Sequence, residues 1–84
     1  MSRNEKLLQK LNKKPPPKDF TWDELRSLLL SLGFEEKQGV GSRVKFIHQR
    51  LAYPVSLHRP HPGNEVKKYV IEQVKDALDE LSLG

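Results

Sequence analysis

Residues 39–65, GVGSRVKFIHQRLAYPVSLHRPHPGNE, predict a β-hairpin that leads into a helix, and this stretch decides the fold. Two glycines allow a turn at residues 39–41, because glycine relieves backbone sterics there. Apolar and polar residues then alternate along residues 43–47 and along residues 52–58. Alternation of this kind is typical of a strand with one buried face. The stretch therefore predicts two antiparallel strands that share an apolar face and a polar face.

The pairing of these two strands follows from their apolar positions. A four-residue loop at residues 48–51 would bring the apolar residues opposite one another. The predicted pairs are Val44 with Val55, Phe46 with Tyr53 and Arg43 with Ser56. In this register His58 lies diagonal to Arg43 on the polar face.

A helix is predicted before the hairpin. Thr21 and Glu24 have the spacing of a capping box, and Gly33 supplies a C-terminal stop. The apolar face between them consists of Trp22, Leu25, Leu28, Leu29 and Leu32. Residues 34–38 follow as a predicted first strand.

A second helix is predicted after the hairpin, with Asn64 as its N-cap. Its recurring apolar residues are Val66, Val70, Val74, Ala77, Leu78 and Leu81. This helix should cover the apolar face of the sheet. The sequence thus predicts an α+β fold with two layers in the order α-β-β-β-α, in which both helices lie on one face of a three-stranded antiparallel sheet and the other face is solvated.

The charge of the chain is unevenly distributed. The net charge is +4 over 84 residues, yet the segment from Lys37 to Lys68 contains seven Lys or Arg and a single acid, Glu65. A basic region of this density favours an anionic partner, most often nucleic acid.

Composition limits the class of protein. A chain of this length holds one small domain, and without cysteine it has neither a disulfide nor a thiolate metal site. No apolar run approaches the roughly 18 to 20 residues that span a bilayer, and residues 1–14 lack the continuous apolar centre of a secretory signal. We therefore expect a cytoplasmic protein.

The first 19 residues are expected to form a basic arm, separate from a single domain at residues 20–84. Leu7, Leu8 and Leu11 allow one or two helical turns, which the three prolines at residues 15–17 then stop. We expect this arm to be loosely attached, either as a basic tail without fixed structure or as an arm that wraps nucleic acid or a partner.

His58 is the candidate for chemistry, because the alternation places it on the polar face with Arg43 and Lys45. A histidine there could take the proton from an RNA 2′-hydroxyl while Arg43 or Lys45 neutralises charge on the phosphoryl oxygens. The alternative is that His58 only hydrogen-bonds a phosphate or caps the strand.

The other histidines have weaker cases. His61 could fix its proline-rich loop or act as a general acid, and His48 is expected to be solvated in the hairpin loop. The spacing of His58 and His61 resembles a metal site, but Glu65 would give only a third ligand, so neither a metal nor another cofactor is expected.

The start of the second helix offers a phosphate site, which its free N–H groups would form together with Asn64. Lys67 and Lys68 lie beside this site in the sequence. With Arg59 and the strand cations, these lysines would form a basic strip. The alternative is that both lysines are simply an exposed helix face. A serine nucleophile is not supported at Ser42 or Ser56, since no partner histidine is identified.

Three segments together resemble the HicA-type toxins of bacterial toxin-antitoxin pairs: the helix ending in LGF, the strand GSRVKF, and the run LHRPHPGNEVKKYVIEQV. The resemblance covers about residues 20–82. It implies a fold like the double-stranded RNA-binding domain, an endoribonuclease that cuts mRNA without a metal, and a HicB-type antitoxin as protein partner.

One position departs from the family pattern. The family's catalytic histidine usually follows the Gly-Ser pair, and here Arg43 follows Gly41 and Ser42. Either His58 has taken over the role, or the protein binds RNA without cutting it; a third alternative is an adaptor for an acidic protein. The expected catalytic residues are His58, Arg43 and Lys45, and the expected RNA contacts are Ser42, Arg59, His61, Asn64, Lys67 and Lys68.

Overall fold

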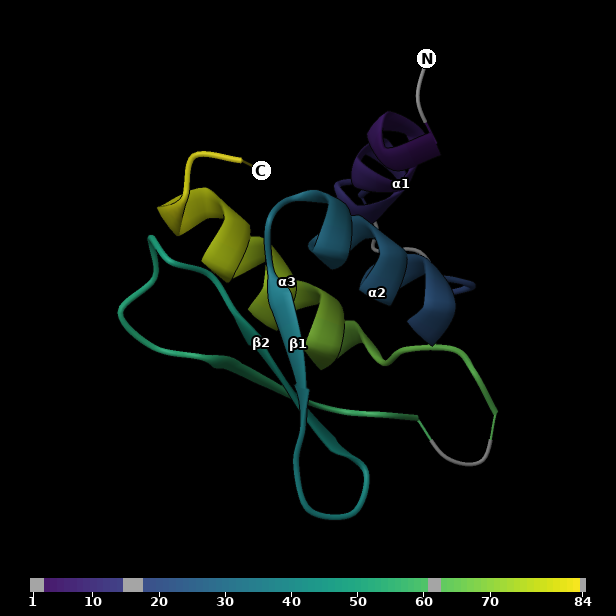
Figure 1. The fold of residues 1–84 in the computed structure, drawn as a ribbon. Coiled ribbons are helices and arrows are strands. Elements are labelled where there is room, and N and C mark those ends of the chain that lie inside the picture. The colour runs from purple at the N-terminus through teal and green to yellow at the C-terminus, as the bar shows by residue number, and fades with distance from the viewer. Residues whose placement is uncertain (1–2, 15–17, 61–62, 84) are drawn as a thin grey trace.

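Three helices and a three-stranded antiparallel sheet follow one another in the order α-α-β-β-β-α (Figure 1). The structure is a computed structural model that describes residues 3–14, 18–60 and 63–83. The elements are α1 (Arg3–Leu11), α2 (Trp22–Ser31), β1 (Glu35–Gln38), β2 (Arg43–Ile47), β3 (Val55–His58) and α3 (Lys68–Glu80). The predicted α+β class and the antiparallel sheet are confirmed, with α1 as an additional helix.

The start of α2 has the predicted capping box. The Thr21 hydroxyl accepts a hydrogen bond from the Glu24 N–H at 3.2 Å, and the Glu24 carboxylate accepts one from the Thr21 N–H at 3.0 Å. The helix ends before Gly33, whose φ of +98° suits a residue without a Cβ. The hydrogen bonds of the capping box satisfy backbone donors that the start of a helix would otherwise leave free.

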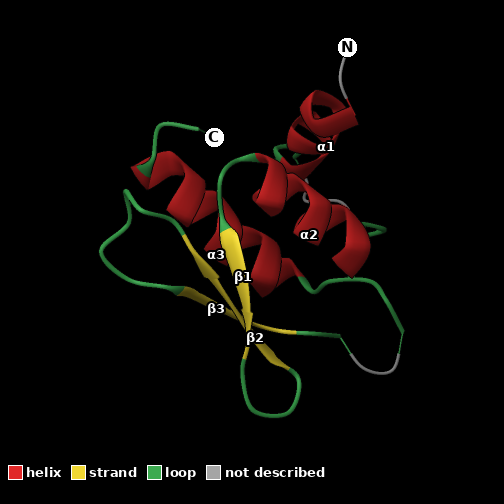
Figure 2. Ribbon diagram, viewed as in Figure 1, coloured by secondary structure: helices red, strands yellow, loops and turns green. Residues whose placement is uncertain are grey.

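The sheet has the strand order β1-β2-β3 and one buried face. Its core residues are Val44, Phe46, Val55 and Leu57, which join the buried residues of α2 and α3 in one cluster. Figure 2 shows these two helices packed over the strands. The opposite face carries Arg43, Lys45, Ser56 and His58, all exposed, so the predicted assignment of faces is confirmed.

The predicted pairing of β2 with β3 is wrong by two residues. The observed pairs are Arg43 with His58, Val44 with Leu57, Lys45 with Ser56 and Phe46 with Val55. The strand begins only at Val55, so the connecting loop is longer than predicted. Tyr53 is 49% exposed, and its hydroxyl donates a hydrogen bond to the Glu80 carboxylate on α3. A shift of the register by two residues leaves each side chain on the same face of the sheet. The predicted faces were therefore correct although the predicted pairs were not.

The predicted cap of the last helix is also wrong. The N-cap of α3 is Lys67, without a side-chain cap, and not Asn64. Asn64 instead accepts a backbone hydrogen bond from the Trp22 N–H at 2.7 Å, and the Val66 N–H donates to the Phe20 carbonyl at 2.8 Å. The segment before α3 is therefore extended and tied to the start of α2.

The N-terminal segment is attached more firmly than predicted. Leu7 and Leu11 of α1 are buried in the common core, the latter completely. Lys10 Nζ lies 3.2 Å from the Glu24 carboxylate of α2. The expectation of a loosely attached arm is thus wrong for α1, while the division of the chain after residue 19 stays a prediction.

His48 is buried, with 7% of its surface exposed, where solvation was predicted. Its ring contacts Phe34 edge to face, and its Nδ1 accepts a hydrogen bond from the Arg50 N–H at 3.1 Å. This histidine therefore has a structural role in the loop after β2.

Candidate nucleic-acid interface

The open face of the sheet brings the main candidate residues together. Arg43 and His58 are directly opposite on β2 and β3, and Lys45 lies two residues further along β2, opposite Ser56. Lys37 of β1 is the neighbour of Lys45 on the other side. This face therefore presents three cations around one exposed imidazole.

The tip of the first hairpin adjoins this face. Ser42 is exposed beside Gly41, whose φ is +66°. The Ser42 carbonyl accepts a hydrogen bond from the Arg59 N–H at 2.8 Å, which extends the pairing of β2 and β3 beyond His58. This bond fixes the backbone of Arg59 next to the hairpin tip.

His58 also lines a cleft between the end of β3 and the start of α3. The cleft has a volume of about 190 Å³. Its lining residues are His58, Arg59, Pro60, Glu65, Val66, Lys67, Tyr69 and Val70. His58 thus has one cation opposite it on the sheet, Arg43, and shares the cleft with another, Lys67 at the N-cap of α3.

Five residues of this cleft were not among the predicted site residues, and two of them, Tyr69 and Glu65, carry polar groups. Tyr69 is 57% exposed in the first turn of α3, and Glu65 pairs with Thr21 in an isolated β-bridge. An aromatic residue beside two lysines on a polar helix face was the only signal for Tyr69 in the sequence. The position of Glu65 depends on the long-range pairing with Thr21, so no local pattern indicated it.

Not every predicted contact lies in this cleft. Lys68 is exposed at the start of α3, and Lys45 lies further along the sheet. Asn64 lines a separate cavity beside α2. His61 lies outside the described residues.

The cations of the interface are available to a ligand. The interface cations are Arg43, Lys45, Arg59, Lys67 and Lys68. Within residues 3–14, 18–60 and 63–83, none of them forms an ion pair with a carboxylate. Unpaired exposed cations at this spacing suit the phosphates of a nucleic-acid backbone.

Among the described residues, no three His, Asp or Glu side chains gather closely enough to hold a metal ion. None of the helices in this part of the chain is long and apolar enough to cross a membrane.

Comparison with known proteins gives one match. A family model described as the HicA toxin of bacterial toxin-antitoxin systems matches residues 22–80. The match spans the chain from the start of α2 to the end of α3. Neither the curated proteins nor the solved structures gave a match.

Proposed function

The chain belongs to the HicA toxin family of bacterial toxin-antitoxin systems, and on this premise we propose that it is an endoribonuclease that cuts mRNA without a metal. The observation that carries the proposal is the position of His58, opposite Arg43 and in one cleft with Lys67. An imidazole with cations nearby can meet a phosphodiester whose charge the cations neutralise.

The reaction begins with His58 as general base. Its imidazole takes the proton of a ribose 2′-hydroxyl, and the 2′-oxygen attacks the adjacent phosphorus. The bond from phosphorus to the 5′-oxygen of the next nucleotide breaks, and that oxygen leaves with a proton from solvent. The products are a 2′,3′-cyclic phosphate and a free 5′-hydroxyl.

The cations act on the charge that develops at phosphorus. Arg43 is the neighbour of His58 in the observed register, so its guanidinium can bind the same phosphodiester. Lys67 approaches from the other wall of the cleft, and Lys45 binds the backbone further along the sheet. Ser42, Arg59 and Lys68 supply additional backbone contacts at the rim.

A protein partner follows from the family. A HicA toxin has an antitoxin, and we propose a HicB-type protein that covers the open sheet face. An acidic surface on that protein would complement the cations of this face.

A second function is favoured by one observation. Arg43 stands where the family's catalytic histidine is expected, so the chain could bind RNA through its cations without cutting it. In that case the protein would read backbone shape and phosphates.

The test is incubation of a 5′-labelled mRNA fragment in EDTA with the wild type and with His58→Ala. We expect wild-type products that end in a 2′,3′-cyclic phosphate, and a loss of about 10²- to 10⁴-fold in rate for the variant. Ser56→Ala is the matched control, because Ser56 is exposed on the same face of the same strand.

Two results would contradict the proposal. One is cleavage by His58→Ala at the wild-type rate, which would remove His58 from the chemistry. The other is intact RNA with a retained gel shift of the wild type, which would identify a binder.

A further inference from the structure

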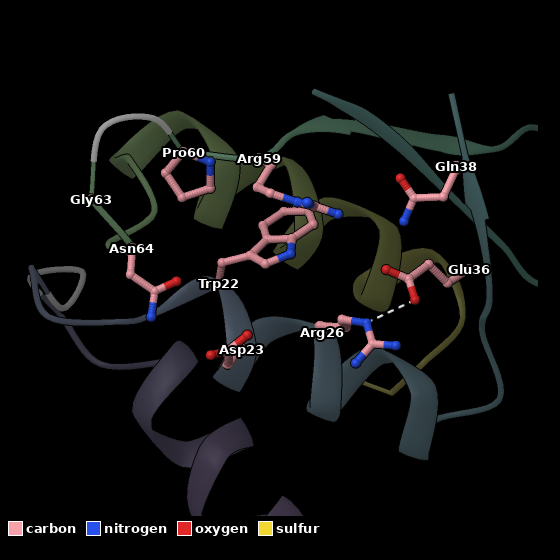
Figure 3. A pocket seen from close by; sticks show the side chains of 9 residues that line it. All are labelled: Trp22, Asp23, Arg26, Glu36, Gln38, Arg59, Pro60, Gly63 and Asn64. Atoms are coloured by element: carbon pink, nitrogen blue, oxygen red, sulfur yellow. Dashed lines mark hydrogen bonds and ion pairs between the residues drawn. The ribbon is translucent and has the colours of Figure 1, made fainter. Parts of the chain in front are cut away.

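A second cavity lies on the other side of Arg59, between the start of α2, strand β1 and the segment after β3. Its volume is about 370 Å³. The lining residues, which Figure 3 shows from close by, are Trp22, Asp23, Arg26, Glu36, Gln38, Arg59, Pro60, Gly63 and Asn64. Of these lining residues, the functions described above use Arg59 alone.

The cavity combines the edge of the core residue Trp22, which is 4% exposed, with groups that donate and accept hydrogen bonds. In Figure 3 the indole of Trp22 lies in the middle with Arg59 just above it, Gln38 and Asn64 lie on opposite sides, and Asp23 lies below. Convergent polar groups that can fix the orientation of a ligand are typical of a small-molecule site.

The charges of the cavity balance. Arg26 Nε donates to the Glu36 carboxylate at 2.7 Å, which neutralises both groups. Among the described residues, the side chains of Asp23 and Arg59 have no hydrogen-bond or ion-pair partner, so one anion and one cation remain for a ligand. A balanced pair of this kind favours a neutral polar ligand over a phosphate.

Asp23 also has a structural explanation, because an acid in the first turn of a helix interacts favourably with the helix dipole. That interaction does not account for the guanidinium of Arg59 or for the amides of Gln38 and Asn64 in the same wall. The combination of all four groups is what indicates a ligand.

The cavity adjoins the proposed catalytic cleft. Arg59 and Pro60 line both spaces. A nucleotide chain whose backbone crosses Arg59 can therefore present a ribose to His58 and an adjacent base to the second cavity.

We propose that this cavity binds one unpaired nucleobase of the RNA, with guanine preferred. Guanine carries N–H donors on its Watson–Crick edge, which suit the Asp23 carboxylate, and the acceptors O6 and N7, which suit the Arg59 guanidinium. Sequence-specific recognition of an unpaired base uses hydrogen bonds to its Watson–Crick and Hoogsteen edges. The inference rests on the proposed function only in that RNA is the ligand.

The test uses the single tryptophan of the chain. In a ¹⁵N-labelled full chain, the only indole N–H signal belongs to Trp22, and it reports the cavity directly. The protein is titrated in separate samples with GMP, AMP, CMP and UMP, and with ribose 5-phosphate as a probe that lacks a base.

We expect a saturable shift with GMP, at an affinity about 5- to 100-fold higher than for the other nucleotides. Asp23→Asn should remove this preference, while Asp79→Asn, an exposed acid on α3, should keep it. His58→Ala should bind GMP as the wild type does, so this result is independent of whether His58 cuts RNA.

Three outcomes would overturn the inference. An equal shift with ribose 5-phosphate would identify a phosphate site, and equal affinity for the four nucleotides would exclude selection of guanine. Absence of any shift of the Trp22 indole would exclude a base from the cavity, even if RNA cleavage by His58 were established.

Discussion

Arg43 and His58 are direct cross-strand neighbours on the open face of the sheet, and both are exposed. Directly opposite residues of an antiparallel pair have Cβ atoms about 4.5 to 5.5 Å apart. A histidine at either position can therefore reach much of the same space. This neighbourhood gives a physical reason why His58 can replace a histidine expected after the Gly-Ser pair.

The relation predicts that the catalytic role proposed for His58 can be moved to position 43. The double variant Arg43→His with His58→Ala should regain at least about tenfold of the cleavage rate that His58→Ala loses, since a positioned base contributes about 10²- to 10⁴-fold. The measurement is the rate of cyclic-phosphate formation. The matched control is the double variant Arg43→Ala with His58→Ala. If Arg43→His with His58→Ala cleaved no faster than this control, positions 43 and 58 would not be equivalent for the histidine.

The lysines at the start of α3 should contribute to RNA affinity through phosphate contacts. Replacement of Lys67 and Lys68 by alanine should lower the slope of log affinity against log salt by about 0.7 for each lost contact with single-stranded RNA. Binding is measured with the His58→Ala background so that RNA stays intact. Lys13→Ala removes an exposed lysine after α1 and should leave the slope unchanged. If Lys13→Ala lowered the slope as much per lysine as the replacement of Lys67 and Lys68, binding would depend only on the net charge of the protein.

The packing of α1 predicts a stability effect outside the interface. Leu11 is completely buried, so Leu11→Ala should lower the free energy of unfolding by about 2 to 5 kcal/mol. Gln9→Ala, an exposed change in the same helix, is the control. Urea unfolding measures both, and a Leu11→Ala effect as small as that of Gln9→Ala would mean that α1 does not pack on the core in solution.

Glu24 should make the stability depend on pH. Partial burial acts to raise the pKa of Glu24, but hydrogen bonds from the Thr21 backbone and from Lys10 outweigh it and lower the pKa below the ordinary value of a glutamate. The stability that ionised Glu24 contributes is therefore complete above the ordinary pKa of a glutamate. It is lost as pH falls through the lowered pKa of Glu24 in the folded state.

The matching variant is Glu24→Gln, which should lose stability near neutral pH and flatten the decline in acid. Urea unfolding across the acidic range measures the effect. Glu72→Gln, an exposed change on α3, is the control. An acid decline of the same steepness in Glu24→Gln would contradict the assignment to Glu24.

Local patterns predicted several elements correctly. The capping box of Thr21 and Glu24 involves residues three apart, so it could be recognised without any tertiary contact. The alternation around Val44 and Phe46 likewise determined which face of the sheet is buried, and therefore that Arg43, Lys45 and His58 lie together on the open face.

The errors arose where a distant contact decided the outcome. Tyr53 has the alternation of a strand residue, but its hydroxyl reaches Glu80 on α3 and the strand begins after it. His48 lies in a loop by its sequence position and is buried because Phe34 packs against its ring. Each of these contacts joins residues far apart in the chain.

The sequence by itself therefore determined the order of the sheet and its two flanking helices, the buried faces and the concentration of cations, because these depend on spacing within short segments. Only the tertiary structure decided that Arg43 stands opposite His58, that Asn64 joins the start of α2, and that α1 completes the core. Strand register and loop conformation depend on contacts between distant segments, and a shift by two residues leaves the local pattern unchanged.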